Sequence, residues 1–308
     1  MPIVIPEDIP AYKTLLGEKI FVMSEKRAAK QDIRPIEIAI VNLMPTKIVT
    51  ETQLMRLLSN SPLQINVTLV STETYTGKNT PLEHLHRFYK PFGEIKNRRF
   101  DGLIVTGAPV ETIEFEEVKY WPELEEIFDF AAKNVTSTIF ICWGAQAALY
   151  HYYGIEKRLL DKKLFGVFKH KKLVQYERLL KGMDDEFYMP HSRHTTIDED
   201  AVRSVKELQL LAASREAGAS IIKSKNNKFF FITGHAEYDR ETLKAEYERD
   251  LAKGLPNVEE PENYFVDGYK NGRGKINMRW ASTANLIYVN WLNYYVYQIT
   301  PFDLGDGE

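Results

Sequence analysis

Short apolar runs alternate with amphipathic segments between residues 36 and 154. The runs at 36–43, 64–71, 101–107 and 136–142 are rich in β-branched residues and predict strands. Segments 48–58, 122–134 and 143–154 carry apolar residues at helical spacing, and Thr80-Pro81 gives a further helix a capping hydroxyl and a first-turn proline. This alternation predicts an α/β fold: an open, mostly parallel sheet with right-handed crossovers and helices on both faces.

The second half of the chain shows a different pattern. Its strand-like runs lie at 164–170, 208–214, 219–224 and 228–233, with Asn226-Asn227 as a hairpin turn between the last two. A helix is predicted from Asp239 to about Gly254, an exposed polar loop at 257–275 and a buried helix at 281–298. We interpret residues 1–308 as one domain, with an α/β core at about 36–254. The segments 1–35 and 255–308 are expected to pack on that core.

Composition narrows the functional classes. The 308-residue chain has a net charge of -3 and a pI near 6.2, which gives no electrostatic argument for nucleic acid or an anionic membrane. No uninterrupted apolar stretch approaches the ~20 residues of a membrane helix. The start lacks a basic region and reaches Glu7 and Asp8 early, so we expect no secretory leader. A single cysteine excludes an intrachain disulfide, and we expect a cytoplasmic protein.

That cysteine, Cys142, lies where the strand TSTIFIC gives way to the helix WGAQAALYHYYG. The amides and the positive dipole end of a helix N-terminus favour a thiolate. The turn needs small residues such as Gly144, and the backbone N–H of Trp143 would point toward an oxyanion formed at the sulfur. The alternative is an inert buried cysteine, since free cysteines are often buried.

A nucleophilic thiol needs a base, and seven histidines are available. His235 follows the apolar strand FFFIT and a glycine, again at the carboxyl end of a strand. Glu237 lies two residues further on the same side of an extended segment, where its carboxylate can orient the imidazole. Three of the other histidines, His170, His191 and His194, lie in segments with several charged residues, and solvated side chains are the alternative to a catalytic role for them.

The two motifs together, C-x-G-x-Q at Cys142 and H-x-E at His235, resemble those of class I glutamine amidotransferases. The resemblance implies a flavodoxin-like sheet and a Cys-His-Glu triad. Further segments over nearly the whole chain resemble the homoserine O-acyltransferases. They are FVMSEKRAAKQDIRP (21–35), NLMPTKIVTETQLMRLL (42–58), IVTGAPVE (104–111), FEEVKYW (115–121), PHSRHT (190–195), GHAEYDRETLKAEYERD (234–250), NYFVDG (263–268) and the aromatic stretch at 290–301.

This resemblance implies acylation of the side-chain hydroxyl of L-homoserine by an acyl-CoA co-substrate, a step toward methionine, without a metal or other cofactor. Residue by residue, the resemblance makes Cys142 the acyl-thioester nucleophile, His235 the proton acceptor and Glu237 its carboxylate partner. It also implies substrate contacts at Lys163, Ser192 and Arg249. Our own candidates for the oxyanion-binding pocket are the backbone N–H groups near Trp143 and Ala108, and Lys47 at a strand end is a further pocket candidate.

In this family the choice between acetyl-CoA and succinyl-CoA is associated with the residue at the position of Glu111, together with Ser192. A glutamate there resembles users of acetyl-CoA and a glycine resembles users of succinyl-CoA, whose terminal carboxylate a glutamate would repel. We therefore expect an acetyltransferase, with a succinyltransferase as the alternative. More distant alternatives are a glutamine-hydrolysing amidotransferase and a non-catalytic binding protein. The aromatic C-terminal segment is compatible with a homodimer interface.

Overall fold

The computed structural model describes residues 3–30, 34–74, 80–270 and 272–300. Parts of the two flanking segments discussed above, at 1–2, 31–33 and 301–308, lie outside these residues. Within them no helix is long and apolar enough to cross a membrane. The strands are β1 (Ile3–Val4), β2 (Val22–Met23), β3 (Ile36–Val41), β4 (Ile65–Ser71), β5 (Tyr89–Pro91), β6 (Phe100–Val105), β7 (Val135–Ile141), β8 (Lys157–Lys172), β9 (Glu186–Ile197), β10 (Leu208–Ser214), β11 (Gly218–Ser224) and β12 (Phe229–Ile232).

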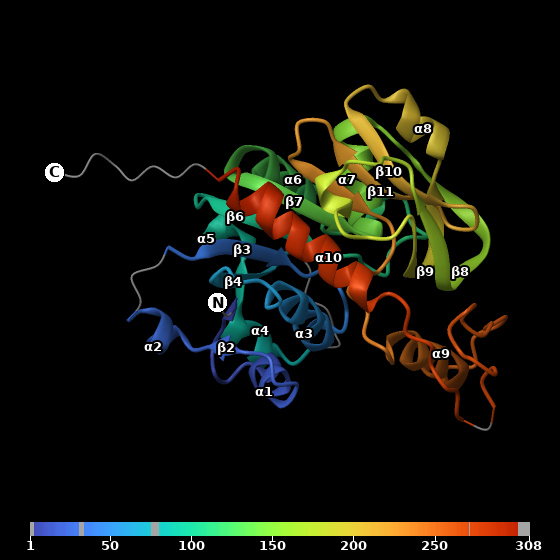
Figure 1. Cartoon of the computed structure of the whole chain (residues 1–308), viewed down its shortest axis with the longest axis horizontal. Coiled ribbons are helices and arrows are strands. Elements are labelled where there is room, and N and C mark those ends of the chain that lie inside the picture. The colour runs from blue at the N-terminus through green and yellow to red at the C-terminus, as the bar shows by residue number, and fades with distance from the viewer. Residues whose placement is uncertain (1–2, 31–33, 75–79, 271, 301–308) are drawn as a thin grey trace.

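Helices separate the strands of the first half and close the chain (Figure 1). The α-helices are α1 (Pro10–Gly17), α2 (Glu25–Ala28), α3 (Lys47–Leu58), α4 (Leu82–Phe88), α5 (Phe92–Ile95), α6 (Trp121–Asn134), α7 (Trp143–Tyr153), α8 (Glu199–Ser204), α9 (Thr242–Ala252) and α10 (Ala281–Trp291). Short 3₁₀ turns form η1 (Phe115–Glu117) and η2 (Arg178–Leu180), and a π-helical turn, η3 (Leu292–Tyr297), continues α10.

One continuous mixed sheet runs through the described chain in the order β2-β1-β4-β3-β6-β7-β12-β11-β10-β8-β9, and β5 pairs with β4. The pairs from β2 to β12 are parallel, and those from β12 to β9 are antiparallel. The central strands β3, β6, β7 and β12 therefore all end at the same edge. Functional groups of open α/β sheets gather at that edge.

Alternate residues of the central strands enter two separate cores, as expected for strands with period two. On one face Ile38 and Ile40 pack with α3 and with α10, which crosses the front of the sheet in Figure 1. On the other face Val41 and Phe140 pack with α6 and α7. The mostly parallel α/β sheet with helices on both faces, predicted from the alternation, is confirmed.

The C-terminal half extends this scaffold with β8 and β9, which pair over most of their length. The described residues of the segment 257–275 are largely exposed, as expected of a polar loop, but Glu262 docks the segment on β8. The amide of Glu262 donates to the Phe165 carbonyl at 2.9 Å, and the amide of Val167 donates to the Glu262 carbonyl at 2.8 Å. At Gly166 a Cβ would lie 2.4 Å from the Glu262 carbonyl oxygen, so only glycine permits this approach. A third apolar cluster joins β8 to α9 here.

Several sequence-based boundaries differ from the structure. The strand β9 was not predicted, because its polar residues obscure the apolar alternation of its buried face. Pro81, and not Thr80, precedes α4, and the Thr80 hydroxyl donates to the carbonyl of Pro45 at 3.3 Å. The helix expected from Asp239 begins at Thr242, three residues later, although it ends near Gly254 as expected.

Candidate active site

Cys142 occupies a sharp turn between β7 and α7. Its backbone has φ 51° and ψ -116°, a conformation that a non-glycine residue adopts only when its surroundings impose it. Its amide donates to the Ile232 carbonyl of β12 at 2.7 Å, which ties the turn to the neighbouring strand. A Cβ at Gly144 would lie 2.5 Å from the Thr106 carbonyl oxygen, so the helix can leave the sheet this closely only with glycine there. The turn presents a buried thiol at the first turn of a helix.

His235 follows the adjacent strand β12 and reaches the same edge. Its amide donates to the Pro190 carbonyl of β9 at 2.8 Å, and its Nδ1 lies 2.7 Å from Oε1 of Glu237. Gly107, after β6, lies beside both segments: a Cβ there would be 3.2 Å from Cβ of Cys142 and 3.5 Å from Cε1 of His235. The structure thus brings the imidazole, the carboxylate and the thiol together.

Electrostatics couple the three side chains. Burial alone would lower the pKa of His235, but the charge of Cys142, the charge of Glu237 and hydrogen bonds to both raise it well above its usual value. If Nδ1 donates its proton to Glu237, Nε2 is left for Cys142. The arrangement can hold a proton on His235 beside a thiolate and exchange it with a reacting group.

The residues expected to bind an oxyanion lie close to this turn. The amides of Trp143 and Gly144 belong to the first helical turn, where backbone N–H groups have no intrahelical acceptor. Ala108 follows Gly107 and is buried, and the Trp143 indole is fully buried in the core under α7. The oxyanion role of Trp143 and Ala108 stays a prediction.

The predicted substrate contacts form a second cluster around α9. Lys163 lies 3.5 Å from Asp250 and 3.9 Å from Glu246, measured from Nζ to the carboxylate oxygens. The hydroxyl of Ser192 donates to Glu246 at 2.6 Å, and Nε of Arg249 donates to Asp250 at 2.8 Å. The Arg249 guanidinium is about half exposed. These side chains offer both charge signs in one place, as a zwitterionic amino acid requires.

Glu111 lies between the two clusters. Burial raises its pKa above the usual value, while an amide of His194 and the positive charges of His235, Lys163 and Arg193 act in the opposite direction. Nζ of Lys157 donates to the Glu111 carbonyl at 3.1 Å, which anchors the loop that carries it. A half-buried carboxylate thus stands within electrostatic reach of both His235 and Lys163.

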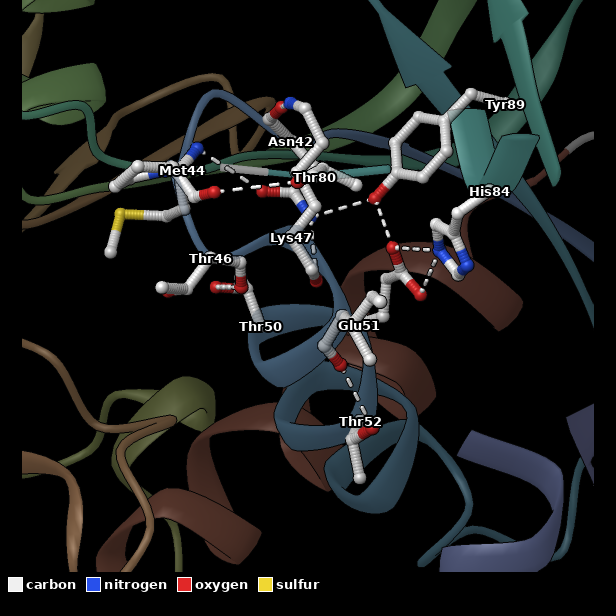
Figure 2. A network of polar contacts seen from close by, with 12 residues as sticks. Asn42, Met44, Thr46, Lys47, Thr50, Glu51, Thr52, Thr80, His84 and Tyr89 are labelled. Atoms are coloured by element: carbon white, nitrogen blue, oxygen red, sulfur yellow. Dashed lines mark hydrogen bonds and ion pairs between the residues drawn. The ribbon is translucent and has the colours of Figure 1, made fainter. Parts of the chain in front are cut away.

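Lys47 belongs to a buried polar network, shown in Figure 2. Its Nζ donates to the carbonyl of Asn42 at the end of β3 and lies 5.5 Å from the ring centroid of Tyr89. Tyr89 donates at 2.5 Å to Glu51, a fully buried carboxylate that also meets Nε2 of His84 at 3.0 Å. Burial lowers the pKa of Lys47 to about 8. That Lys47 also serves the reaction pocket stays a prediction.

Two sets of residues beside the site escaped the sequence analysis. Glu246 has the helical spacing i, i+3 to Arg249, a signal that could have placed both on one face of α9. His170 and His191 are fully buried, so the alternative of solvated side chains, which the sequence left open, does not hold for them, although His194 is exposed. Among the described residues no group of three His, Cys, Asp or Glu side chains is arranged to hold a metal ion.

Comparisons with known proteins identify the family and the fold. A family model described as homoserine O-succinyltransferase matches residues 2–302. Proteins named homoserine O-acetyltransferase are similar over nearly their whole length: one from Acetivibrio thermocellus is 55% identical, covering 99% of both chains, and one from Clostridium acetobutylicum is 57% identical, covering 99% of this chain and 100% of that protein.

A solved glutamine amidotransferase from Methylobacillus flagellatus has the same fold. It superposes with a TM-score of 0.55 at 14% identity, and the match covers 85% of this chain and 95% of that chain. At that identity the likeness concerns the fold alone. It confirms the flavodoxin-like, class I glutamine amidotransferase-like architecture that the two motifs implied.

Proposed function

Because this chain belongs to the homoserine O-acyltransferase family, we propose that it is a homoserine O-acetyltransferase that works through an acyl-enzyme on Cys142. It transfers the acetyl group of acetyl-CoA to the side-chain hydroxyl of L-homoserine, in methionine biosynthesis. The observation that carries the proposal is the buried Cys142 at a strained turn, beside a His235 whose Nδ1 is held 2.7 Å from Glu237.

The first half-reaction makes the acyl-enzyme. The Cys142 thiolate attacks the thioester carbonyl of acetyl-CoA, and the amide of Trp143 donates to the oxyanion that forms. The bond from the acetyl carbon to the CoA sulfur breaks, and CoA leaves as a thiol with the proton that His235 carried. The products are CoA, an acetyl thioester on Cys142 and a neutral imidazole.

The second half-reaction uses that imidazole as the base. His235 Nε2 removes the proton of the homoserine hydroxyl while the oxygen attacks the acetyl carbon of the thioester. The bond to Sγ breaks, which releases O-acetylhomoserine and restores the thiolate beside a protonated His235. Glu237 stabilises the positive imidazolium in both half-reactions. Each proton that His235 accepts in one turnover leaves with CoA in the next.

The cluster around α9 fits the amino acid end of homoserine. Arg249 offers a planar fork for the carboxylate, and its guanidinium is half-exposed, so a ligand can reach it beside Asp250. Glu246 can accept a hydrogen bond from the ammonium group, with Ser192 and Lys163 arranged around it. With its carboxylate on Arg249 and its ammonium group on Glu246, homoserine would point its hydroxyl toward Cys142.

Glu111 supports acetyl-CoA over succinyl-CoA. A succinyl group would bring its carboxylate toward a half-buried carboxyl whose pKa burial already raises, and like charges in such a place repel by roughly several kcal/mol. The relatives named above are acetyltransferases, although the family description names succinyl transfer. A homodimer and a cytoplasmic location stay predictions.

Intact-mass spectrometry tests nucleophile and donor together. Incubation with acetyl-CoA should add one acetyl group, and addition of homoserine should remove it. Succinyl-CoA should give little adduct, and Cys142→Ala should give none with either donor. An adduct on Cys142→Ala, or near-normal turnover by that variant, would contradict the assignment. Release of ammonia from glutamine without acetyl transfer would instead support an amidotransferase.

A further inference from the structure

A chain of buried hydrogen bonds runs behind the catalytic residues, from β8 through β9 to α7. Nδ1 of His170 lies 2.9 Å from the Phe168 carbonyl, and Nε2 of His170 lies 3.1 Å from Nε2 of His191. Nε of Arg193 donates to Nδ1 of His191 at 3.4 Å. His170 and His191 are fully buried and Arg193 is only 1% exposed. None of these three residues has a role in the reaction described above.

The contacts fix the protonation of both imidazoles. His170 must donate from Nδ1, because the Phe168 carbonyl can only accept, and a neutral His170 then accepts at Nε2. His191 must therefore donate from its own Nε2 and accept the Arg193 proton at Nδ1. Burial lowers the pKa of His170 to about 4 and the pKa of His191 well below its usual value, so both rings are neutral at pH 7. Of the three side chains in this row of hydrogen bonds, Arg193 carries the positive charge.

Within the part of the chain that the structure describes, none of the hydrogen-bond partners of Arg193 is a carboxylate. Nη1 donates to the Thr195 carbonyl and Nη2 donates to the Ala217 carbonyl at 2.6 Å. The pKa of Arg193 is lowered to about 10, chiefly by burial, and the negative charges of Cys142 and Glu111 act in the opposite direction. A buried cation is costly without a compensating negative charge, and these two groups of the reaction site supply one.

The same strand fastens the nucleophile helix. Gln146, one turn after Cys142, donates from Nε2 to the Thr195 carbonyl at 3.2 Å and accepts from the Thr195 hydroxyl at 2.7 Å. The Thr195 carbonyl thus receives both Gln146 and Arg193. The glutamine of the C-x-G-x-Q motif and the buried guanidinium share one anchor.

A further contact joins this chain to the catalytic base. Gly234, directly before His235, lies against the His191 ring, where a Cβ would be 2.9 Å from Cε1 and Nε2. Ser192, between His191 and Arg193, faces the opposite side of β9 and meets Glu246 of the α9 cluster. The strand β9 therefore contacts the helix α7 that follows Cys142, the segment that carries His235, and the α9 cluster.

We propose that Arg193 is a positioning residue of the transfer reaction: its buried guanidinium, fixed by two backbone carbonyls and by the neutral His191–His170 pair, holds a permanent positive charge that stabilises the Cys142 thiolate. The inference rests on the proposed function for its purpose but concerns the thiolate itself. Arg193 acts from behind the nucleophile and does not touch the acyl group.

Alkylation of the thiol by iodoacetamide measures this effect directly. Cys142 is the only cysteine of the chain, so the reaction reports on no other thiol. The charged and titratable groups around it are His235, Glu237, Tyr238, Glu111 and Arg193. In Arg193→Gln the midpoint of the alkylation rate against pH should rise, because the variant lacks a buried positive charge that favours the thiolate.

Lys223→Met provides the matched control. Lys223 is a buried cation in β11, and its partners lie outside the site: it pairs with Glu177 at 2.6 Å and lies 5.7 Å from the ring centroid of Tyr295. Its loss should lower the thermal midpoint of unfolding and leave the alkylation midpoint where it is in the wild type. If Arg193→Gln behaves in the same way, with lower thermal stability and an unmoved alkylation midpoint, Arg193 has only a structural role and the proposal is overturned.

A second variant covers the case in which Arg193→Gln does not fold. His191→Leu keeps the charge of Arg193 but removes the acceptor that helps to fix its guanidinium, so the alkylation midpoint should rise by a smaller amount. An unmoved midpoint in folded His191→Leu would then overturn the proposal. Failure of the proposed acetyltransferase function would appear differently, as absent acetyl transfer in the wild type, and would leave these alkylation rates unchanged.

Discussion

Nδ1 of His235 lies 2.7 Å from Oε1 of Glu237, and both side chains are only 4% exposed. In so little water the carboxylate interacts strongly with the ring. It directs one nitrogen of the imidazole toward itself and leaves the other for Cys142. The same carboxylate stabilises the imidazolium each time His235 takes a proton. The pair therefore acts on both the orientation and the charge of the base.

Glu237→Gln should separate these two effects. The amide oxygen can still accept from Nδ1, so the ring orientation survives while the negative charge is lost. We expect kcat to fall by roughly 10²–10⁴-fold, the range typical of impaired general acid–base catalysis, with a small change in KM for homoserine. Steady-state kinetics of acetyl transfer provide the measurement. A kcat within about twofold of the wild type would show that the Glu237 charge is dispensable.

Glu111→Gly should change the choice of donor. Removal of the half-buried carboxylate opens space and removes a like charge, so the ratio of kcat/KM for succinyl-CoA to that for acetyl-CoA should rise by roughly tenfold or more. Glu114→Gly, on the exposed part of the same loop, is the control and should leave the ratio unchanged. Equal ratios in the two variants would remove the basis for assigning donor choice to Glu111.

Glu246→Gln should weaken binding of homoserine selectively. The charge-assisted hydrogen bond to the ammonium group would become neutral, so KM for homoserine should rise by roughly 10–100-fold with little change in KM for acetyl-CoA. Glu248→Gln is matched to it, since Glu248 lies on the same helix and accepts from Tyr269 at 2.5 Å. A comparable rise of KM in both variants would indicate a general effect on α9 and not a contact to homoserine.

The parallel half of the fold could be predicted because each element carries its own signal. β3, β6 and β7 are buried on both faces and so appear in the sequence as short runs rich in apolar and β-branched residues. β9 lacks that signal. Its buried positions include His191, Arg193 and Thr195, polar side chains whose partners come from β8, from Ala217 just before β11, and from α7. Those partners exist only after the chain has folded, so single-sequence periodicity could not identify the strand.

The candidate site divides in the same way. Cys142, His235 and Glu237 were recognisable because a turn and a two-residue spacing are local features. Glu246 and Arg193 could not be recognised in this way, because they are linked to residues more than forty positions away in the sequence. Glu246 accepts from Ser192, and Arg193 is linked to Gln146 through Thr195. A charge at such a position appears in the sequence as an ordinary surface charge. Burial, which the sequence does not show, distinguishes it from the solvated ones.

Burial of His170 should make the protein sensitive to mild acid. The pKa of His170 is lowered by burial from about 6.5 to about 4, so the unfolded chain takes up a proton below pH 6.5 that the folded protein refuses until about pH 4. In that interval the unfolded state binds more protons, and the free energy of unfolding therefore falls as the pH falls. This one group accounts for a loss of about 3 kcal/mol between pH 6.5 and 4.

His170→Gln should flatten this dependence, since glutamine does not titrate. Its amide oxygen can still accept from His191, so part of the buried chain is retained. Urea unfolding at pH 7, 5.5 and 4 measures the effect, with exposed His86→Gln as the control that should follow the wild type. Some acid sensitivity remains in His170→Gln, because burial also lowers the pKa of His191. A slope as steep as that of His86→Gln would show that His170 accepts its proton as readily in the folded protein as in the unfolded chain.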